Sequence, residues 1–384
     1  MKPLHLARLY YFLYFGAVGC YFPYVNLYFQ KVGLSGKAIG VLAALGPLIL
    51  LGASPAWGAL GDRFRVHRYL LPLATGGSII PVLLMPQFAQ FAPLAALTVA
   101  GAFFSTAINP LIDSAVLDLV VNTEHAYGGI RVWGSIGFTL VTWGLGYVIK
   151  AAGLDWLFYS YAVLMALAAL VALALPPRRQ TWQTSFRHSL TQLLRQKSLA
   201  LFFVSAFLCG AAFTAFNAFF SIHLVAIGGN EAWVGLAGAL GAIAEMPILF
   251  YSPLLFRKLG VRGSLGGSFL MYVARWLVLA FARSPVLVLL TQLTHGVTYG
   301  AFLVGGVAYV DEHTPPGLSA TAQGLFVATT FGLGAATGAA MGGWLYEARG
   351  AMGMFLGAAA AATLGLAFLM AAGKGHRQER AFES

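Results

Sequence analysis

Long apolar segments are the feature that most constrains how this chain can fold. A membrane-spanning helix needs about 20 consecutive, mostly apolar residues. Only 9% of the residues are charged and 59% are hydrophobic, whereas soluble domains carry about 25% charged residues. We therefore predict an all-α integral membrane protein with twelve transmembrane helices, near residues 7–29, 37–60, 69–88, 92–119, 129–150, 155–175, 199–226, 232–256, 263–282, 285–310, 318–346 and 350–373.

The connections between these segments are short, with one exception. The longest connection is rich in basic residues and follows the sixth segment. It predicts an N-terminal six-helix half over residues 1–176, a cytoplasmic linker over 177–198, and a C-terminal six-helix half with a short cytoplasmic tail over 199–384.

Lysine and arginine are distributed unequally between the two sets of loops. The N-terminus, the C-terminus and the loops after predicted helices 2, 6 and 8 hold 16 of the 23 basic residues. Cytoplasmic loops are enriched in these residues, so both termini are predicted to be cytoplasmic, in a bacterial inner membrane. The net charge of +11 does not indicate a nucleic-acid partner, because the basic residues form no continuous stripe. The remaining seven are Lys31, Lys37, Lys150, Arg283 and Arg349 in the opposite loops, and Arg131 and Arg275 in or beside spans.

The two halves contain an internal repeat. Residues 27–40 (LYFQKVGLSGKAIG) align without gaps on residues 222–235 (IHLVAIGGNEAWVG), and Gly33 coincides with Gly228. Many transporters consist of such a duplicated unit, with the substrate site between the halves near the membrane midplane. The alternative is chance similarity between two apolar stretches.

Asp113 and Arg131 lie near the ends of two successive apolar segments. An ionised side chain at membrane depth costs roughly 2.5 to 3.5 kcal/mol on insertion scales, so it is rarely present without a partner or a function. We expect the two charges to meet across an antiparallel helix pair. They would then either bind substrate or form a cytoplasmic salt bridge that stabilises one conformation.

Three further polar residues lie within predicted spans of the second half: Glu245, Arg275 and His295. Desolvation favours the protonated form of a buried carboxyl group, and an approaching cation favours ionisation, so Glu245 could carry a proton. Arg275 would be its fixed counter-charge, since guanidinium keeps its proton. His295 could relay protons or donate to substrate. The alternatives are a permanent ion pair for Glu245 and Arg275, and a purely structural role for His295.

The segment after the second predicted helix reads GALGDRFRVHR. It resembles the G-x-x-x-D-R-x-x-R-R loop signature of the major facilitator superfamily, with Arg65 in place of the usual glycine. The resemblance implies a conformational gate formed by Gly58, Asp62, Arg63 and Arg68. The simpler alternative is a positively charged membrane anchor.

Within that superfamily, nearly the whole chain is similar to the lactose permease and phenylpropionate permease group of proton symporters. The stretches YFGAVGCYFPYVNLYFQKVGLS, YGGIRVWGSIGF, AEMPILFYSPLLFRKLG and QLTHGVTYG carry this similarity. It implies the major facilitator fold with two pseudo-symmetric halves, with Asp113 and Arg131 spaced like the permease's substrate-binding pair. Phe138, Ile248 and Thr298 replace the permease's tryptophan, asparagine and acidic residue, which disfavours galactosides.

Other residues are candidates for lining the cavity. Aromatic side chains at helical spacing usually serve packing, so each is a candidate only. The substrate-binding candidates besides Asp113, Arg131 and His295 are Phe138, Trp133, Tyr24, Asn26, Asn109, Phe216 and Asn217. The glycine-rich sequence GLGAATGAAMGGW in the eleventh segment has the small-residue spacing of close helix contacts.

The sequence therefore predicts a secondary active transporter and not an enzyme, because it contains no clustered nucleophile or metal-binding set. We expect a monomeric proton symporter of a small organic solute, with aromatic or other monocarboxylates favoured. The proton gradient supplies the energy, so no metal or other cofactor is implied. The alternatives are a sugar or nucleoside symporter, an exporter, or a lipid flippase on the same fold.

Overall fold

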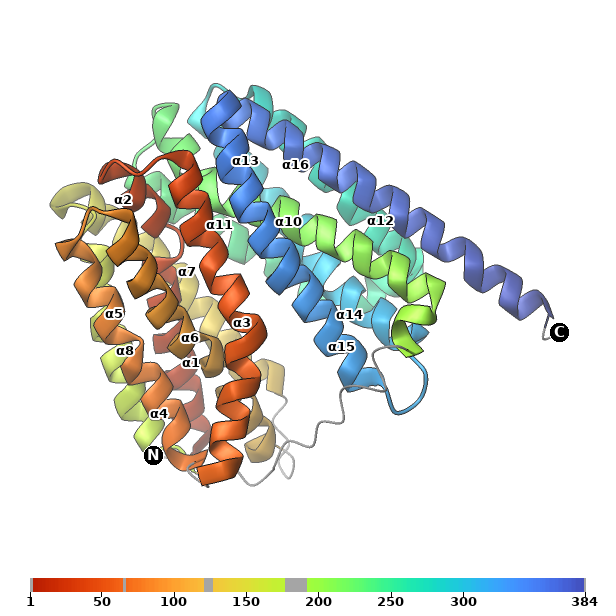
Figure 1. Ribbon diagram of the computed structural model, residues 1–384, viewed down its shortest axis with the longest axis horizontal. Coiled ribbons are helices and arrows are strands. Elements are labelled where there is room, and N and C mark those ends of the chain that lie inside the picture. The colour runs from red at the N-terminus through yellow and green to blue at the C-terminus, as the bar shows by residue number, and fades with distance from the viewer. Residues whose placement is uncertain (1–2, 65–66, 121–126, 177–191, 383–384) are drawn as a thin grey trace. The chain divides into compact units, whose positions relative to one another are not determined.

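The computed structural model describes residues 3–64, 67–120, 127–176 and 192–382. At residues 54–55, 58–64, 67–68 and 374–382 the description covers the backbone alone. In the described residues every regular element is a helix (Figure 1), which confirms the predicted all-α class.

The chain divides into two compact units. Unit 1 is Met1–Trp182 with Leu224–Ala239, and unit 2 is Gln183–His223 with Leu240–Ser384. The domain boundaries given above stay a prediction, because most of the linker, residues 177–198, lies outside the described ranges.

The helices before the linker belong to unit 1. They are α1 (Pro3–Tyr21), α2 (Val25–Lys31), α3 (Gly36–Phe64), α4 (His67–Gly77), α5 (Ile79–Leu84), the 3₁₀ turn η1 (Met85–Gln87), α6 (Phe91–Val120), α7 (Tyr127–Ala152) and α8 (Trp156–Leu173).

The helices after the linker include two π-helical turns, η3 and η4, and a 3₁₀ turn, η2. They are α10 (Lys197–Ala226), α11 (Glu231–Phe250), α12 (Ser252–Phe281), α13 (Pro285–Thr291), η2 (Gln292–Thr294), η3 (Gly296–Gly300), α14 (Ala301–His313), α15 (Ser319–Val327), η4 (Ala328–Gly334) and α16 (Ala335–Phe382).

Ten helical segments of the described chain are long and apolar enough to cross a membrane. The last of them, Ser319–Gly373, has 55 residues and bends at Gly350, where φ is 65° and ψ is −168°. It therefore makes two crossings. Helices α1 and α2, separated by a short turn, form one more. All twelve predicted crossings are thus present.

The eighth predicted crossing differs in detail from its expected range of 232–256. Helix α11 ends at Phe250, and Tyr251 (φ −95°, ψ 13°) separates it from α12. Pro247 lies in the last turn of α11, where its ring opposes the carbonyl four residues earlier and removes one helical N–H. Helix α12 then bends at Gly260, whose φ is 70°.

The internal repeat is visible in the backbone. Gly33 and Gly228, which coincide in the alignment, have φ values of 90° and 99°. In each turn the residue after the glycine donates its N–H to the carbonyl five residues earlier, at 3.1 Å in the first turn and 3.0 Å in the second. This is the bonding of a glycine-terminated helix end. The two glycines serve the same purpose, since only glycine adopts this conformation without strain.

Small residues allow α10 to approach the glycine-rich helix closely, as predicted. Gly334, Gly338 and Gly342 are spaced four residues apart, so they share one helix face. A Cβ atom on Gly338 would overlap the backbone of α10, and the other two glycines leave almost as little space. The three contact, in order, Phe207, Ala211 and Ala215.

In unit 1, α1 packs along α7 and α8, and α3 packs on α6. Large apolar side chains also remain on the outside of the helices, as lipid contact requires. Examples are Ile80, Leu170 and Phe250, of which 65%, 63% and 78% is exposed.

Candidate functional site

Arg275 is the centre of a polar cluster in unit 2. It lies in the C-terminal part of α12, and only 3% of it is exposed. Its Nη2 donates to Oε1 of Gln292 at 2.8 Å, and its Nη1 donates to Oγ1 of Thr298 at 3.4 Å. Nη1 also lies 3.3 Å from Nδ1 of His295. The guanidinium carbon is 4.7 Å from the ring centroid of Phe216, in a cation–π contact.

An irregular helix supplies these hydrogen-bonding partners. The tenth crossing changes from α13 to the 3₁₀ turn η2, and then to the π-helical turn η3 before α14 begins. Gln292 opens η2, His295 joins the two turns, and Thr298 lies within η3. Single π-helical turns occur frequently at functional sites. The sequence predicted one continuous span here, because hydropathy does not distinguish these turns from an α-helix.

The contact between Arg275 and His295 defines the state of the imidazole. A guanidinium group only donates hydrogen bonds, so Nδ1 of His295 accepts here and the ring proton of the neutral imidazole is on Nε2. The ring also stacks on Tyr299, with centroids 5.4 Å apart and planes at 22°. A proton added at Nδ1 would break the bond to Arg275.

Glu245 approaches the same irregular segment from α11. A Cβ atom on Gly300 would lie 3.2 Å from Cγ of Glu245, and one on Gly296 would overlap the carbonyl group of Ala244. These two glycines, four residues apart in and around η3, let α11 pack closely against it. The structure thus places the acid against the turn that follows His295.

A second charged cluster lies in unit 1, among α1, α6 and α7. Tyr11 donates to a carboxylate oxygen of Asp113 at 2.5 Å. The guanidinium carbon of Arg131 lies 3.9 Å from the ring centroid of Phe15 and 5.5 Å from that of Tyr11. In the described part of the chain no ion pair joins Asp113 directly to Arg131, and Tyr11 contacts both residues. A Cβ atom at Gly134 would be 2.8 Å from Nη1 of Arg131, so this glycine makes room for the arginine.

Two predicted substrate-binding residues, Tyr24 and Asn217, donate hydrogen bonds to backbone carbonyl groups. Tyr24 is fully buried and donates to the carbonyl of Thr142 at 2.8 Å. The amide of Asn217 donates to the carbonyl of Phe213, one turn earlier in α10, at 3.0 Å. Both contacts stabilise helices.

The remaining predicted site residues are spread over the molecule. Phe216 belongs to the Arg275 cluster, as described above. Phe138 lies against Gly19 of α1, and Asn26 is 9% exposed. Trp133 is 40% exposed, and Asn109 is also exposed.

The predicted gate lies outside the described side chains. Gly58, Asp62 and Arg63 belong to α3, and Arg68 belongs to α4, with the backbone alone described at each.

The sequence reasoning missed several aromatic neighbours of the charged groups. Tyr11 and Phe15 are four residues apart on α1, and their rings flank Arg131. Tyr299 follows His295 by four residues, and Tyr272 precedes Arg275 by three. Residues at these spacings share a helix face, which is the signal that could have identified the two in the second half.

Twelve crossings, an internal repeat and two clusters around charged side chains define a membrane transport protein of two related halves. The chain belongs to the MFS_1 like family, whose family model matches residues 5–357.

Known proteins support the same class. The chain is 30% identical over 343 residues to a maltose permease of Geobacillus stearothermophilus, covering 88% of this chain and 86% of the relative. It is 25% identical over 318 residues to a probable 3-phenylpropionic acid transporter of Escherichia coli (strain K12), covering 78% and 80%. The crystal structure of the nucleoside transporter NupG has the same fold, with a TM-score of 0.86 at 20% identity, covering 97% of this chain and 100% of that one. The chain is therefore a major facilitator permease and not an enzyme.

Proposed function

We propose that this permease is a proton-coupled symporter that carries a small organic solute into a bacterial cell by alternating access. The protein would lie in the inner membrane with both termini in the cytoplasm. Two acids, Asp113 and Glu245, balance two arginines, Arg131 and Arg275. One added proton leaves the set positive, which favours a solute that is an anion. The membrane gradient supplies the energy, and the proposal requires no cofactor.

We further propose that the solute is an aromatic monocarboxylate. The observation that carries this is the environment of Arg275, which is 3% exposed and hydrogen-bonded to side chains that bear no formal charge. Its Nε has no hydrogen-bonding partner among the described residues. A carboxylate would accept from this donor, and guanidinium geometry suits such a planar anion. The ring of Phe216 beneath the guanidinium offers apolar surface beside the charge.

The proton would be carried by Glu245, whose side chain lies against η3. Glu245 lies against Gly300 of η3, and Arg275 contacts Gln292, His295 and Thr298 in the same run of turns. A shift in these turns would alter the distance between acid and guanidinium, and an approaching cation favours the ionised acid. Substrate capture at Arg275 and proton release from Glu245 would then depend on one element.

A sugar is the second candidate, because the maltose permease is 30% identical over most of both chains. Each sugar hydroxyl group that leaves water must find a hydrogen-bonding partner. The two candidates therefore differ in whether the solute's carboxylate or its hydroxyl groups are required for binding.

Competition for uptake into proteoliposomes tests the substrate class. Radiolabelled 3-phenylpropionate uptake should be blocked by excess arylalkanoic acids, and should be unaffected by maltose or by the uncharged 3-phenylpropionamide. The amide keeps the ring and the chain length, so it isolates the contribution of the negative charge. Uptake of a disaccharide that arylalkanoic acids fail to inhibit, even at large excess, would overturn the proposal.

A further inference from the structure

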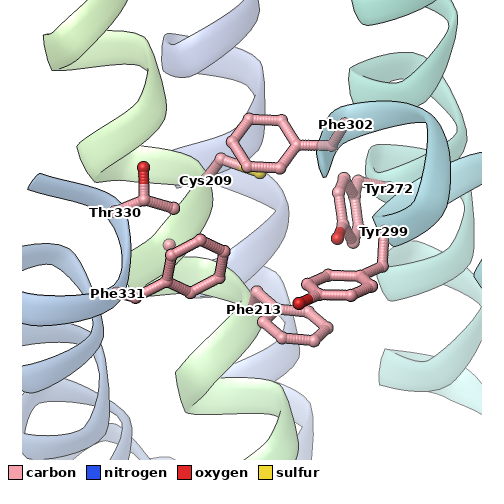
Figure 2. A pocket seen from close by; sticks show the side chains of 8 residues that line it. Cys209, Phe213, Tyr272, Tyr299, Phe302, Thr330 and Phe331 are labelled. Atoms are coloured by element: carbon pink, nitrogen blue, oxygen red, sulfur yellow. The ribbon is translucent and has the colours of Figure 1, made fainter. Parts of the chain in front are cut away.

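Unit 2 contains a narrow, partly open crevice beside the Arg275 cluster. The space free of atoms between its walls, open solvent included, is about 170 Å³, and in this conformation none of it is wide enough to hold a water molecule. Figure 2 shows Tyr272 and Tyr299 on one side of it, and Thr330 and Phe331 on the other. The lining residues are Cys209, Gly210, Phe213, Tyr272, Tyr299, Phe302, Thr330 and Phe331.

Two polar groups in this lining have unused hydrogen-bonding capacity. The hydroxyl oxygens of Tyr272 and Thr330 are buried and have no partner among the described residues. Each of the two residues is only 1% exposed. Buried hydroxyl groups are normally paired, and leaving one unpaired is destabilising. A molecule that enters the crevice can supply the missing partner.

The chemistry of the lining indicates what would enter. Five aromatic rings present flat apolar surface, and the two unpaired hydroxyl groups can each donate or accept. A flat ring with a hydroxyl substituent satisfies both features. A sugar, with several hydroxyl groups and no flat ring, would leave most of its groups unpaired.

The walls contain the elements that could open the crevice. Tyr299 belongs to the π-helical turn η3, and Thr330 and Phe331 belong to η4. In the closed form the rings of Phe213 and Tyr299 stack with centroids 4.6 Å apart. π-helical turns are less regular than α-helices and often mark functional positions. A small change in η3 would separate these rings, and a change in η4 would move Thr330 and Phe331 on the other side.

The crevice is linked to the guanidinium through α12. Tyr272 precedes Arg275 by three residues on one helix face, so their backbone positions differ by about 4.5 Å along the axis. Tyr299, on the same side of the crevice as Tyr272, stacks on His295, which contacts Arg275. A carboxylate on Arg275 and a ring in the crevice are thus within reach of one molecule with a short alkyl linker.

We propose that the crevice is the ring subsite of the substrate, and that Tyr272 and Thr330 select arylalkanoates with a hydroxyl group on the ring. This inference rests on the proposed transport of aromatic monocarboxylates. It adds a position for the ring and a preference among the acids.

Cys209 reports directly on occupancy of the crevice. Cys20 and Cys209 are the two free cysteines, both buried, so Cys20→Ala leaves Cys209 as the single thiol. We expect methyl methanethiosulfonate to modify Cys209 slowly in ligand-free protein, and 3-(4-hydroxyphenyl)propionate to slow the reaction further. Phenol should also protect, whereas propionate should not, because it carries no ring. A thiol that never reacts would show that the crevice does not open and would overturn the proposal.

A second variant tests the selection. Thr330→Val removes the hydroxyl group with little change of shape, and Thr329→Val is its matched control outside the crevice lining. We expect Thr330→Val to weaken binding of the hydroxylated acid about fivefold, the typical effect of one neutral hydrogen bond, and to leave 3-phenylpropionate unchanged. Equal affinities of Thr330→Val and wild-type protein for the hydroxylated acid would contradict the proposed role.

The outcomes separate this inference from the proposed function. Transport of arylalkanoates without protection of Cys209 would leave the function standing and place the ring elsewhere. Protection of Cys209 by phenol without any arylalkanoate transport would confirm the ring subsite and overturn the proposed substrate.

Discussion

A guanidinium group buried in a membrane protein is costly unless its donors are paired. In Arg275, Nη1 and Nη2 meet a threonine, a histidine and a glutamine, while Nε has no partner among the described residues. The partners of Arg275 are hydrogen-bond acceptors held in fixed positions around its planar guanidinium group. Lysine, with a compact ammonium group on a flexible chain, cannot reproduce this geometry.

Arg275→Lys should therefore weaken binding of aromatic carboxylates while keeping the charge. Hydrogen bonds to charged groups contribute about 1.5 to 3 kcal/mol, which corresponds to roughly a 10- to 100-fold rise in KM for uptake. Arg283→Lys, at an exposed position after α12, is the matched control and should behave like the wild type. Unchanged KM values in Arg275→Lys would remove the arginine from the binding site.

The carboxylate of Asp113 also has a specific hydrogen-bonding partner, the hydroxyl group of Tyr11. The 2.5 Å bond from the tyrosine hydroxyl group to the carboxylate is charge-assisted, and such bonds are about twice as strong as neutral ones. Tyr11→Phe should lower the free energy of unfolding by about 1.5 to 3 kcal/mol, seen as a lower melting temperature in detergent. Tyr147→Phe is the control. This side chain is 56% exposed, so the substitution should leave the melting temperature unaltered. Equal melting temperatures of Tyr11→Phe and the wild-type protein would show that water or another donor replaces Tyr11.

At the scale of elements, close packing and irregular turns have different roles in unit 2. Helix α16 and η4 approach α10 through glycines, which fixes one side of the unit. The tenth and eleventh crossings each contain a π-helical turn, η3 and η4. These turns supply Thr298 to the Arg275 cluster, and Tyr299, Thr330 and Phe331 to the lining of the crevice. The other lining residues belong to the regular helices α10, α12 and α14.

Gly338→Ala tests the rigid contact. The added methyl group would overlap the backbone of Ala211, and overpacking of this kind typically costs about 1 to 3 kcal/mol. Gly266→Ala is the control, because a Cβ atom there meets nothing within 4 Å. Alanine is also the better helix former, by about 1 kcal/mol. We expect a lower melting temperature for the first variant and an equal or higher one for the second. A stable Gly338→Ala protein would show that the two helices can separate freely.

At the scale of the whole molecule, the fold was predictable from physical constraints that act on long segments. A bilayer requires apolar spans of nearly fixed length, so the twelve crossings follow from hydropathy. The repeat followed from Gly33 and Gly228, because a left-handed turn needs glycine. The small-residue spacing of the glycine-rich segment predicted a close helix contact, and the structure identifies α10 as the partner.

The site was predictable only in part. An ionisable side chain in an apolar span costs free energy and is therefore rare there without a function. On this basis the sequence identified Asp113, Arg131, Glu245, Arg275 and His295. The partners of these residues were harder to predict, because tyrosine, threonine and phenylalanine are common in membrane spans. The contacts of Tyr11 with Asp113 and Arg131 and the π-helical turns depend on tertiary packing, which a single sequence does not encode locally.

The central claim is that proton movement through Glu245 drives accumulation of the solute. It is tested most directly by uptake of 3-phenylpropionate into proteoliposomes with an imposed pH gradient, alkaline inside. One pH unit corresponds to about 1.4 kcal/mol, so one proton per solute supports at most about tenfold accumulation.

We predict that the wild-type protein accumulates the acid above its equilibrium distribution across the membrane. This accumulation should stop when a protonophore collapses the gradient. Glu245→Gln, which imitates the protonated acid, should retain exchange of labelled for unlabelled solute and lose uphill accumulation. Accumulation by Glu245→Gln at the wild-type rate, or wild-type accumulation that is indifferent to the gradient, would contradict the account.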